Sequence, residues 1–120
     1  MLFRSNGEKV PPVDMELAIL LDPLFEQVMI IGEGRPYLAA LVVLNRKEAE
    51  RAGNITDKVL AARITAQLKA FPGYAQIRRV AVLDEPWTVE SGLVTPTLKL
   101  KRGPILEKFK ARVDELYKGR

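Results

Sequence analysis

The residues best suited to chemistry lie in the stretch Thr95-Pro96-Thr97-Leu98-Lys99-Leu100-Lys101-Arg102, where three cations follow a Thr-Pro-Thr. In an extended conformation alternate side chains share a face, so Lys99 and Lys101 would project from the same side. Leu98 and Leu100 would then anchor the segment from the opposite side. A solvated basic strand that binds nothing explains the same pattern, and the residues by themselves leave both interpretations open.

A second candidate is the turn Ser5-Asn6-Gly7-Glu8 near the start of the chain. A glycine in such a turn lets backbone N–H groups come close to a ligand, because no side chain intervenes. Asn-Gly is also the commonest short hairpin signal, so a turn without any ligand accounts for the same residues.

Several kinds of site are excluded by what the sequence lacks. The chain contains no cysteine and no histidine, which removes thiolate nucleophiles, imidazole bases, zinc clusters and disulfides. Its acidic residues are scattered and form no loop with EF-hand spacing. We therefore predict no metal site.

The net charge of +4 is concentrated at the C-terminal end. Residues 99–120 carry 8 Lys+Arg against 3 Asp+Glu, whereas residues 1–98 carry 11 against 12. A positive patch of this kind favours phosphate, carboxylate, nucleic acid or anionic lipid as partners and does not choose among them.

The length and composition indicate one domain. The 120 residues, of which 48% are apolar, suffice for one core and are too few for two, so residues 1–120 are expected to form a single unit. No apolar run approaches the roughly 18 residues that span a bilayer. The N-terminal residues lack the apolar segment and cleavage site of a signal peptide. We therefore expect a cytoplasmic protein.

The N-terminal segment predicts a ribbon followed by a helix. The Asn-Gly turn places a short β-ribbon over Met1 to Val10. A helix is expected to begin at Pro12 and to end near Asp22-Pro23. The apolar residues at helical spacing that we expect it to bury are Val13, Leu17 and Leu20.

Three strands and two further helices are predicted in the rest of the chain. The strands are Phe25 to Ile31, Tyr37 to Leu44 and Arg78 to Leu83, and the second has so little polar alternation that it should be covered on both faces. One helix follows the N-cap Thr56, and the last begins at Gly103-Pro104. The apolar positions of these two helices are Leu60, Ile64, Leu68 and Phe71, and then Ile105, Phe109, Val113 and Leu116 or Tyr117. Between them, residues 84–98 should form an ordered loop.

The element order ββαββαβα predicts a small α+β domain, with an N-terminal β-ribbon and a three-stranded main sheet packed with helices.

Three stretches of the chain carry a resemblance to a known family: NGEKVPPVDME, VMIIGEGRPYLAALVVLN and FPGYAQIRRVAVLDEPWTVESGLVTPTLKLKR. In order and spacing they resemble the C-terminal domain of the AMP-forming (adenylate-forming) enzymes, and among these the bacterial long-chain fatty-acid:CoA ligases. The resemblance implies a mobile lid whose partner is a large N-terminal domain of the same polypeptide, with the hinge residue just before Met1. In the intact enzyme that domain would bind ATP, the fatty acid and Mg²⁺, and this chain alone would hold no cofactor tightly and have no ligase activity.

The resemblance also implies roles for two residues. Lys99 matches the lysine that reaches the fatty-acid carboxylate and the ATP α-phosphate in one pose of the lid. Such an ammonium stabilises charge and need not act as a base, because a fatty acid is already ionised at neutral pH. Gly7 matches the turn that helps to line the CoA channel in the second pose.

Two alternatives stay open on the sequence alone. A small basic module could bind nucleic acid or an anionic membrane, although Phe109 and Tyr117 fall on the apolar face of the last helix and leave no platform for base stacking. We therefore expect no nucleic acid as a partner, and membrane contact at most peripheral to the inner face of the membrane. A free-standing regulator of a ligase supplied in trans is the other alternative.

Overall fold

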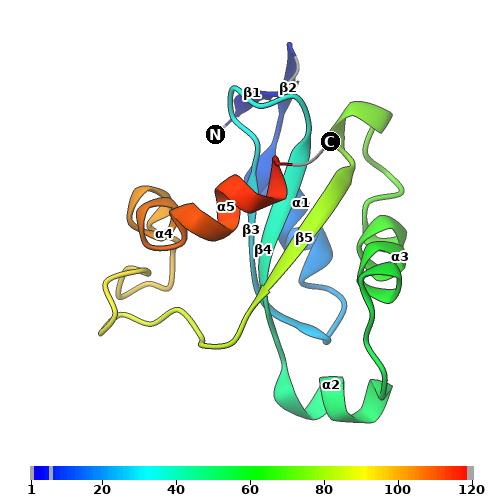
Figure 1. The fold of residues 1–120 in the computed structure, drawn as a ribbon, viewed down its shortest axis with the longest axis vertical. Coiled ribbons are helices and arrows are strands. Elements are labelled where there is room, and N and C mark those ends of the chain that lie inside the picture. Colours follow the sequence, from blue (N-terminus) through cyan, green and yellow to red (C-terminus); the bar gives the residue numbers. More distant parts are fainter. Residues whose placement is uncertain (1, 6, 119–120) are drawn as a thin grey trace.

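The main sheet forms because three apolar segments of seven residues pair side by side. The computed structural model, which describes residues 2–5 and 7–118, places them in the order β3 (Phe25–Ile31), β4 (Leu38–Leu44) and β5 (Ile77–Leu83) (Figure 1). Strands β3 and β4 are antiparallel, with Val28 opposite Val42, and β4 and β5 are parallel. The predicted α+β class and the three-stranded main sheet are therefore confirmed.

Helices cover both faces of this sheet (Figure 1). Helices α1 (Pro12–Ile19) and α3 (Asp57–Gln67) pack on one face, and α4 (Arg102–Lys108) and α5 (Lys110–Leu116) pack on the other. Because side chains alternate along a strand, β4 sends Ala40 and Val42 into the first core and Leu41 and Val43 into the second. This confirms that the second apolar run is a strand buried on both sides.

The N-terminal ribbon is confirmed across the residues that the structure describes. Strand β1 (Phe3–Ser5) pairs antiparallel with β2 (Glu8–Val10), and Phe3 lies opposite Val10. Both of these side chains are buried in the core that α1 and α3 cover. Met1 and Asn6, which the predicted ribbon includes, lie outside the described residues.

Two features of the helices differ from the prediction. Helix α2 (Arg46–Ala52) was not predicted, because five of its seven residues are charged and none is buried. Its local signal is Asn45, which caps it by accepting a hydrogen bond from the Glu48 N–H. The single final helix is two helices, because the backbone leaves helical geometry at Phe109.

The other helical expectations hold, except that Leu68 and Phe71 lie beyond the end of α3 at Gln67. Thr56 caps α3, whose Leu60 and Ile64 are buried. Ile105 and Val113 are buried in the second core, and Phe109 and Tyr117 pack against it. A short 3₁₀ turn (Gly73–Ala75) precedes β5. Among the described residues, no helix is long and apolar enough to cross a bilayer.

The predicted buried face of α1 is wrong. Leu17 is 60% exposed, and Val13 and Leu20 are also exposed, whereas the helix buries Pro12, Met15, Glu16 and Ile19. Apolar residues surround most of this helix, so their spacing fits more than one face. The observed face includes a carboxylate, which sequence patterning assigns to solvent. The helix also ends at Ile19, before the predicted end near Asp22-Pro23.

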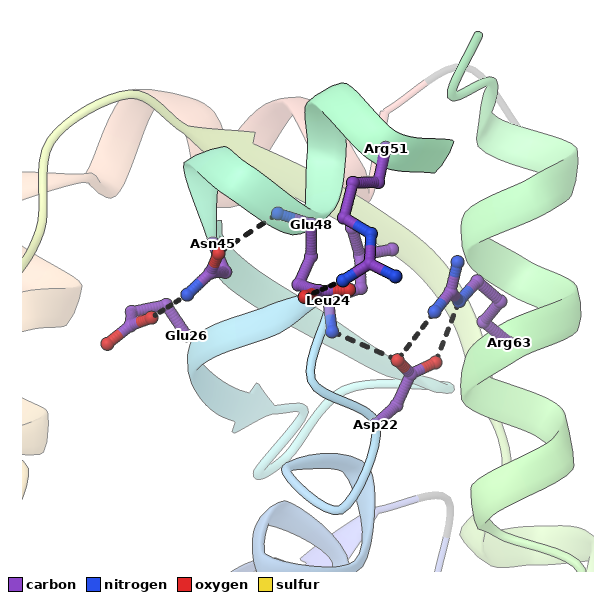
Figure 2. Close-up of polar contacts among 7 residues, drawn as sticks. All are labelled: Asp22, Leu24, Glu26, Asn45, Glu48, Arg51 and Arg63. Carbon is purple, nitrogen blue, oxygen red and sulfur yellow. Dashed lines mark hydrogen bonds and ion pairs between the residues drawn. The ribbon is translucent and has the colours of Figure 1, made fainter. Parts of the chain in front are cut away.

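A bidentate ion pair joins the turn after α1 to α3. Arg63 donates from Nε and Nη2 to the two carboxylate oxygens of Asp22, each at 2.7 Å, and the Leu24 N–H donates to the same carboxylate at 3.0 Å (Figure 2). The hydrogen bonds from Arg63 lower the pKa of Asp22, against the opposing effect of burial. Nearby, Asn45 donates to Glu26 and thereby ties α2 to β3 (Figure 2).

We expect Asp22→Asn to lower the free energy of unfolding by about 2 kcal/mol at pH 7, because hydrogen bonds to a charged group are lost. The depressed pKa of Asp22 means that this contribution is complete above its unfolded-state value of about 3.9 and is lost as the pH falls toward the folded-state value. Urea unfolding at a series of pH values measures both effects. If the difference in unfolding free energy between the wild type and the Asp22→Asn variant stays constant down to pH 3, this account is contradicted.

Candidate functional site

The loop between β5 and α4 is ordered although it contains no helix or named strand, as predicted. Its anchor is Trp87, whose indole is buried and whose backbone N–H and C=O both pair with the side-chain amide of Gln27 on β3, at 2.7 and 2.9 Å. Leu93 and Val94 are also buried, and the Lys101 N–H donates to the Leu93 carbonyl at 2.9 Å. The loop is therefore held to the sheet at both ends.

Residues 95–102 do not have the extended conformation in which Lys99 and Lys101 would share a face, because they begin with a tight turn. The Leu98 N–H donates to the Thr95 carbonyl at 2.7 Å, and the Thr95 N–H donates to the Lys99 carbonyl at 2.8 Å. The Lys99 N–H donates to Thr95 Oγ1 at 3.0 Å, and Val94 and Leu100 form an antiparallel bridge. Thr95 supplies three of these contacts, so it is the residue that closes the turn.

Leu98 does not anchor the segment as predicted. Leu98 is 75% exposed, and its backbone φ is +65°. Among the described residues it is the only non-glycine residue with a positive φ. A left-handed conformation costs a residue with a Cβ about 1–2 kcal/mol. Leu100 does pack against the second core. The fold thus holds an exposed leucine in a strained position directly before Lys99.

The Lys99 ammonium is exposed, and within residues 2–5 and 7–118 it has no hydrogen-bond or ion-pair partner. The Lys99 backbone is nevertheless held by the hydrogen bonds of the turn. The ammonium can therefore change its position only by rotation about the side-chain bonds. An ammonium placed in this way can approach carboxylate or phosphate oxygens on another molecule. Across the part of the chain that is described, no three acidic side chains gather in a group that could hold a metal ion.

A buried ion pair fixes the end of the Lys99 segment. Arg102 donates from Nη2 and Nη1 to the two carboxylate oxygens of Glu16, at 2.6 and 2.8 Å. The Ile30 N–H donates to the same carboxylate at 2.7 Å, and Glu16 is only 6% exposed. One carboxylate thereby joins α1, β3 and the start of α4, three residues after Lys99.

Glu16 was missed by sequence reasoning. Its local signal was only an acidic residue inside an apolar helix, which is normally assigned to the solvated face.

Gly7 lies at the tip of the ribbon, exposed, with φ +82°. A side chain added there would meet no atom within 4 Å, so the structure itself requires glycine only for the backbone conformation. The ribbon lies at the top of the view in Figure 1, and the loop that carries Lys99 runs out at the lower left. The structure does not bring the two predicted site residues together.

A groove of about 850 Å³ opens beside Lys99. Its walls come from the exposed face of α1, from β3 and from the loop after β5. The lining residues are Val13, Glu16, Leu17, Leu20, Glu26, Gln27, Val28, Pro86, Trp87, Val94, Leu98, Lys99, Leu100 and Arg102. The exposed apolar residues of α1, Val13, Leu17 and Leu20, therefore line the same groove as Lys99.

Sequence comparison agrees with the resemblance. The family described as the AMP-binding enzyme C-terminal domain matches residues 1–120. A chloroplastic long-chain-fatty-acid–acyl-carrier-protein ligase of Arabidopsis thaliana is 34% identical over 94% of the chain. A long-chain-fatty-acid–CoA ligase of Mycobacterium tuberculosis is 27% identical over 98%. The chain spans only 16% and 22% of the lengths of these two relatives.

Solved structures show the same fold. The adenylation domain of a carboxylate reductase from Mycobacterium chelonae matches 98% of the chain with a TM-score of 0.84 and 29% identity. The A-PCP didomain of a carboxylic acid reductase from Segniliparus rugosus, in complex with AMP, matches 98% with a TM-score of 0.86 and 23% identity. The chain covers 19% and 17% of those proteins.

We expect Glu16→Gln to loosen the Lys99 turn selectively, because Arg102 loses its counter-charge. Amide hydrogen exchange of Lys99 and Lys101 should accelerate about tenfold beyond any change in global stability, which corresponds to about 1.4 kcal/mol. Asp22→Asn is the matched control, since it breaks the comparable pair with Arg63 away from this loop. Equal acceleration at Lys99 and Lys101 in the two variants would contradict a local role for Glu16.

Proposed function

Because the chain belongs to the family of AMP-binding enzyme C-terminal domains, we propose that it is the mobile part of a long-chain fatty-acid ligase and supplies Lys99 to the adenylation step. The observation that carries the proposal is the exposed Lys99 ammonium, which has no partner among the described residues and stands on a backbone held by hydrogen bonds. The long-chain ligases among the relatives support a fatty acid as the substrate.

The proposed reaction has two steps. The fatty-acid carboxylate attacks the α-phosphorus of ATP and releases pyrophosphate; an acceptor thiol then attacks the acyl carbon, loses its proton and releases AMP. Negative charge builds up on the phosphoryl oxygens during the first attack, and a compact ammonium can interact with those oxygens and with the carboxylate together. Lys99 would thus stabilise and position the reacting groups without exchanging a proton.

The remainder of the polypeptide would hold ATP, the fatty acid and Mg²⁺. Mg²⁺ would neutralise phosphate charge there. A cytoplasmic location, with at most peripheral contact with a membrane, belongs to the same proposal.

Two acceptors would fit the proposal: the thiol of CoA, and the thiol carried by an acyl carrier protein. The Mycobacterium relative is named for CoA, and the more similar Arabidopsis relative is named for the carrier protein. Gly7, at the exposed tip of the ribbon, would border the path of the acceptor in either form. Steady-state transfer assays of the full polypeptide with each acceptor distinguish the two.

We expect Lys99→Ala in the full polypeptide to slow acyl-adenylate formation by about 10²–10³-fold, the usual effect of removing one preorganised charge-stabilising donor. Thioester formation from preformed adenylate should change little. The measurement is fatty-acid-dependent pyrophosphate exchange beside a single-turnover transfer assay. Lys101→Ala, which removes an exposed lysine two positions away, is the control. Unchanged exchange in the Lys99 variant would remove this lysine from adenylation.

We expect Gly7→Leu to produce the opposite pattern, because a bulky side chain at the ribbon tip would obstruct the acceptor thiol. Pyrophosphate exchange should be retained and thioester formation should fall by about tenfold or more, an obstruction of at least 1.4 kcal/mol. Gly53→Leu is a matched control, since Gly53 has the same φ of +82° and equally open surroundings after α2. Equal loss of both half-reactions in the Gly7 variant would exclude the channel role.

A further inference from the structure

Lys99 follows directly after a short hairpin connection. Val94 and Leu100 are bridged as in an antiparallel hairpin, and residues 96–98 connect Thr95 to Lys99. Hairpin connections of this length usually have a glycine in the left-handed conformation at their last position. Leu98 occupies that position here, with φ +65°. Because this conformation is unfavourable for leucine, other contacts have to maintain it.

The hydroxyl of Thr95 supplies a contact for which its own carbonyl is already used. The Thr95 carbonyl accepts the Leu98 N–H at 2.7 Å, and the Thr95 N–H donates to the Lys99 carbonyl at 2.8 Å. The Lys99 N–H donates instead to Thr95 Oγ1, at 3.0 Å. Thr97 Oγ1 lies 3.1 Å from the same hydroxyl. One side chain thereby holds the peptide group from which the Lys99 side chain extends.

The direction of the Lys99 side chain depends on that peptide group. A backbone rotation beside Lys99 turns its Cα–Cβ bond, and the long side chain carries the change out to the ammonium. Displacement of a charge-stabilising group from its productive place slows a reaction, because the group then meets the reacting atoms at the wrong distance and angle. We propose that Thr95 is a positioning residue for adenylation, whose hydroxyl orients Lys99 toward the reacting carboxylate and phosphate.

This inference rests on the proposed function, since it assumes that Lys99 stabilises charge in adenylation. It adds a second residue that the step requires and that acts only through Lys99. Serine at position 95 would keep the acceptor of the Lys99 N–H, whereas valine would replace it by a methyl group. The chemistry of the side chain, and not only its bulk, should therefore decide the rate.

The test is Thr95→Val in the full polypeptide, because valine is also branched at Cβ and lacks only the hydroxyl. The kcat of fatty-acid-dependent pyrophosphate exchange should fall by about 10–100-fold, the usual effect of misplacing a reacting or stabilising group. The KM values for ATP and the fatty acid should change little, because the lost interaction belongs to the transition state. Transfer from preformed acyl-adenylate should also be retained. Thr95→Ser should keep exchange near the wild-type rate.

Thr88→Val is the matched control. Thr88 lies in the same loop, and its Oγ1 likewise accepts a backbone N–H, from Ser91 at 3.0 Å. It does not line the groove that contains Lys99. Exchange should therefore be unchanged in this variant. Equal slowing of exchange in Thr88→Val and Thr95→Val would attribute the effect to general loosening of the loop and reject the inference.

A double variant shows whether Thr95 acts through Lys99. Lys99→Ala combined with Thr95→Val should exchange no more slowly than Lys99→Ala alone, because no ammonium is left to orient. Full additivity of the two losses would overturn the inference, as would equal slowing in Thr95→Val and Thr95→Ser. Slow exchange in Lys99→Ala with normal exchange in Thr95→Val would reject only the positioning role. Normal exchange in Lys99→Ala would reject the proposed function and this inference with it.

Discussion

The organisation of this domain depends on one buried carboxylate. Glu16 can remain charged inside the protein only if its oxygens are satisfied, and they are satisfied by the Arg102 guanidinium and the Ile30 N–H. These partners come from different parts of the chain, and Arg102 is 86 residues away from Glu16 in sequence. These contacts to the Glu16 carboxylate hold α1 against β3 and bring Arg102, at the start of α4, to the same carboxylate. The position of the Lys99 turn follows from these contacts, since the turn lies between this pair and the buried Trp87.

The sheet determines which parts of the surface remain for function. Two exposed segments outside the helices and the main sheet carry the candidate residues, the ribbon tip with Gly7 and the loop after β5 with Lys99, and they lie in different parts of the molecule (Figure 1). A ligand small enough to fit one active site could not contact both together. The proposed division of two half-reactions between Lys99 and Gly7 is therefore compatible with this fold only if the domain changes its orientation between them.

Local signals in the sequence predicted those parts of the fold that local physics determines. The continuous apolar run of β4 indicated burial on both sides, and Thr56 marked the start of α3 through its hydroxyl cap. The resemblance supplied Lys99 and Gly7 as candidates. Two features depend on distant partners or on backbone geometry and were not predicted: the buried Glu16 and the left-handed Leu98. Helix α2 was also not predicted, because it buries none of its residues and so has no apolar periodicity. No periodicity reports a partner 86 residues away.

The misassigned face of α1 has a physical cause that also bears on function. Sequence patterning finds apolar stripes, but it cannot tell whether a stripe is covered by the rest of its own domain or by another part of a larger protein. Helix α1 has apolar residues on both sides: Met15 and Ile19 face the core, and Leu17 faces solvent beside Lys99. A helix with a single buried face would gain nothing from Leu17, because an exposed leucine contributes little to folding. Two apolar faces on one short helix are expected where the helix carries its own core on one side and meets a second body on the other.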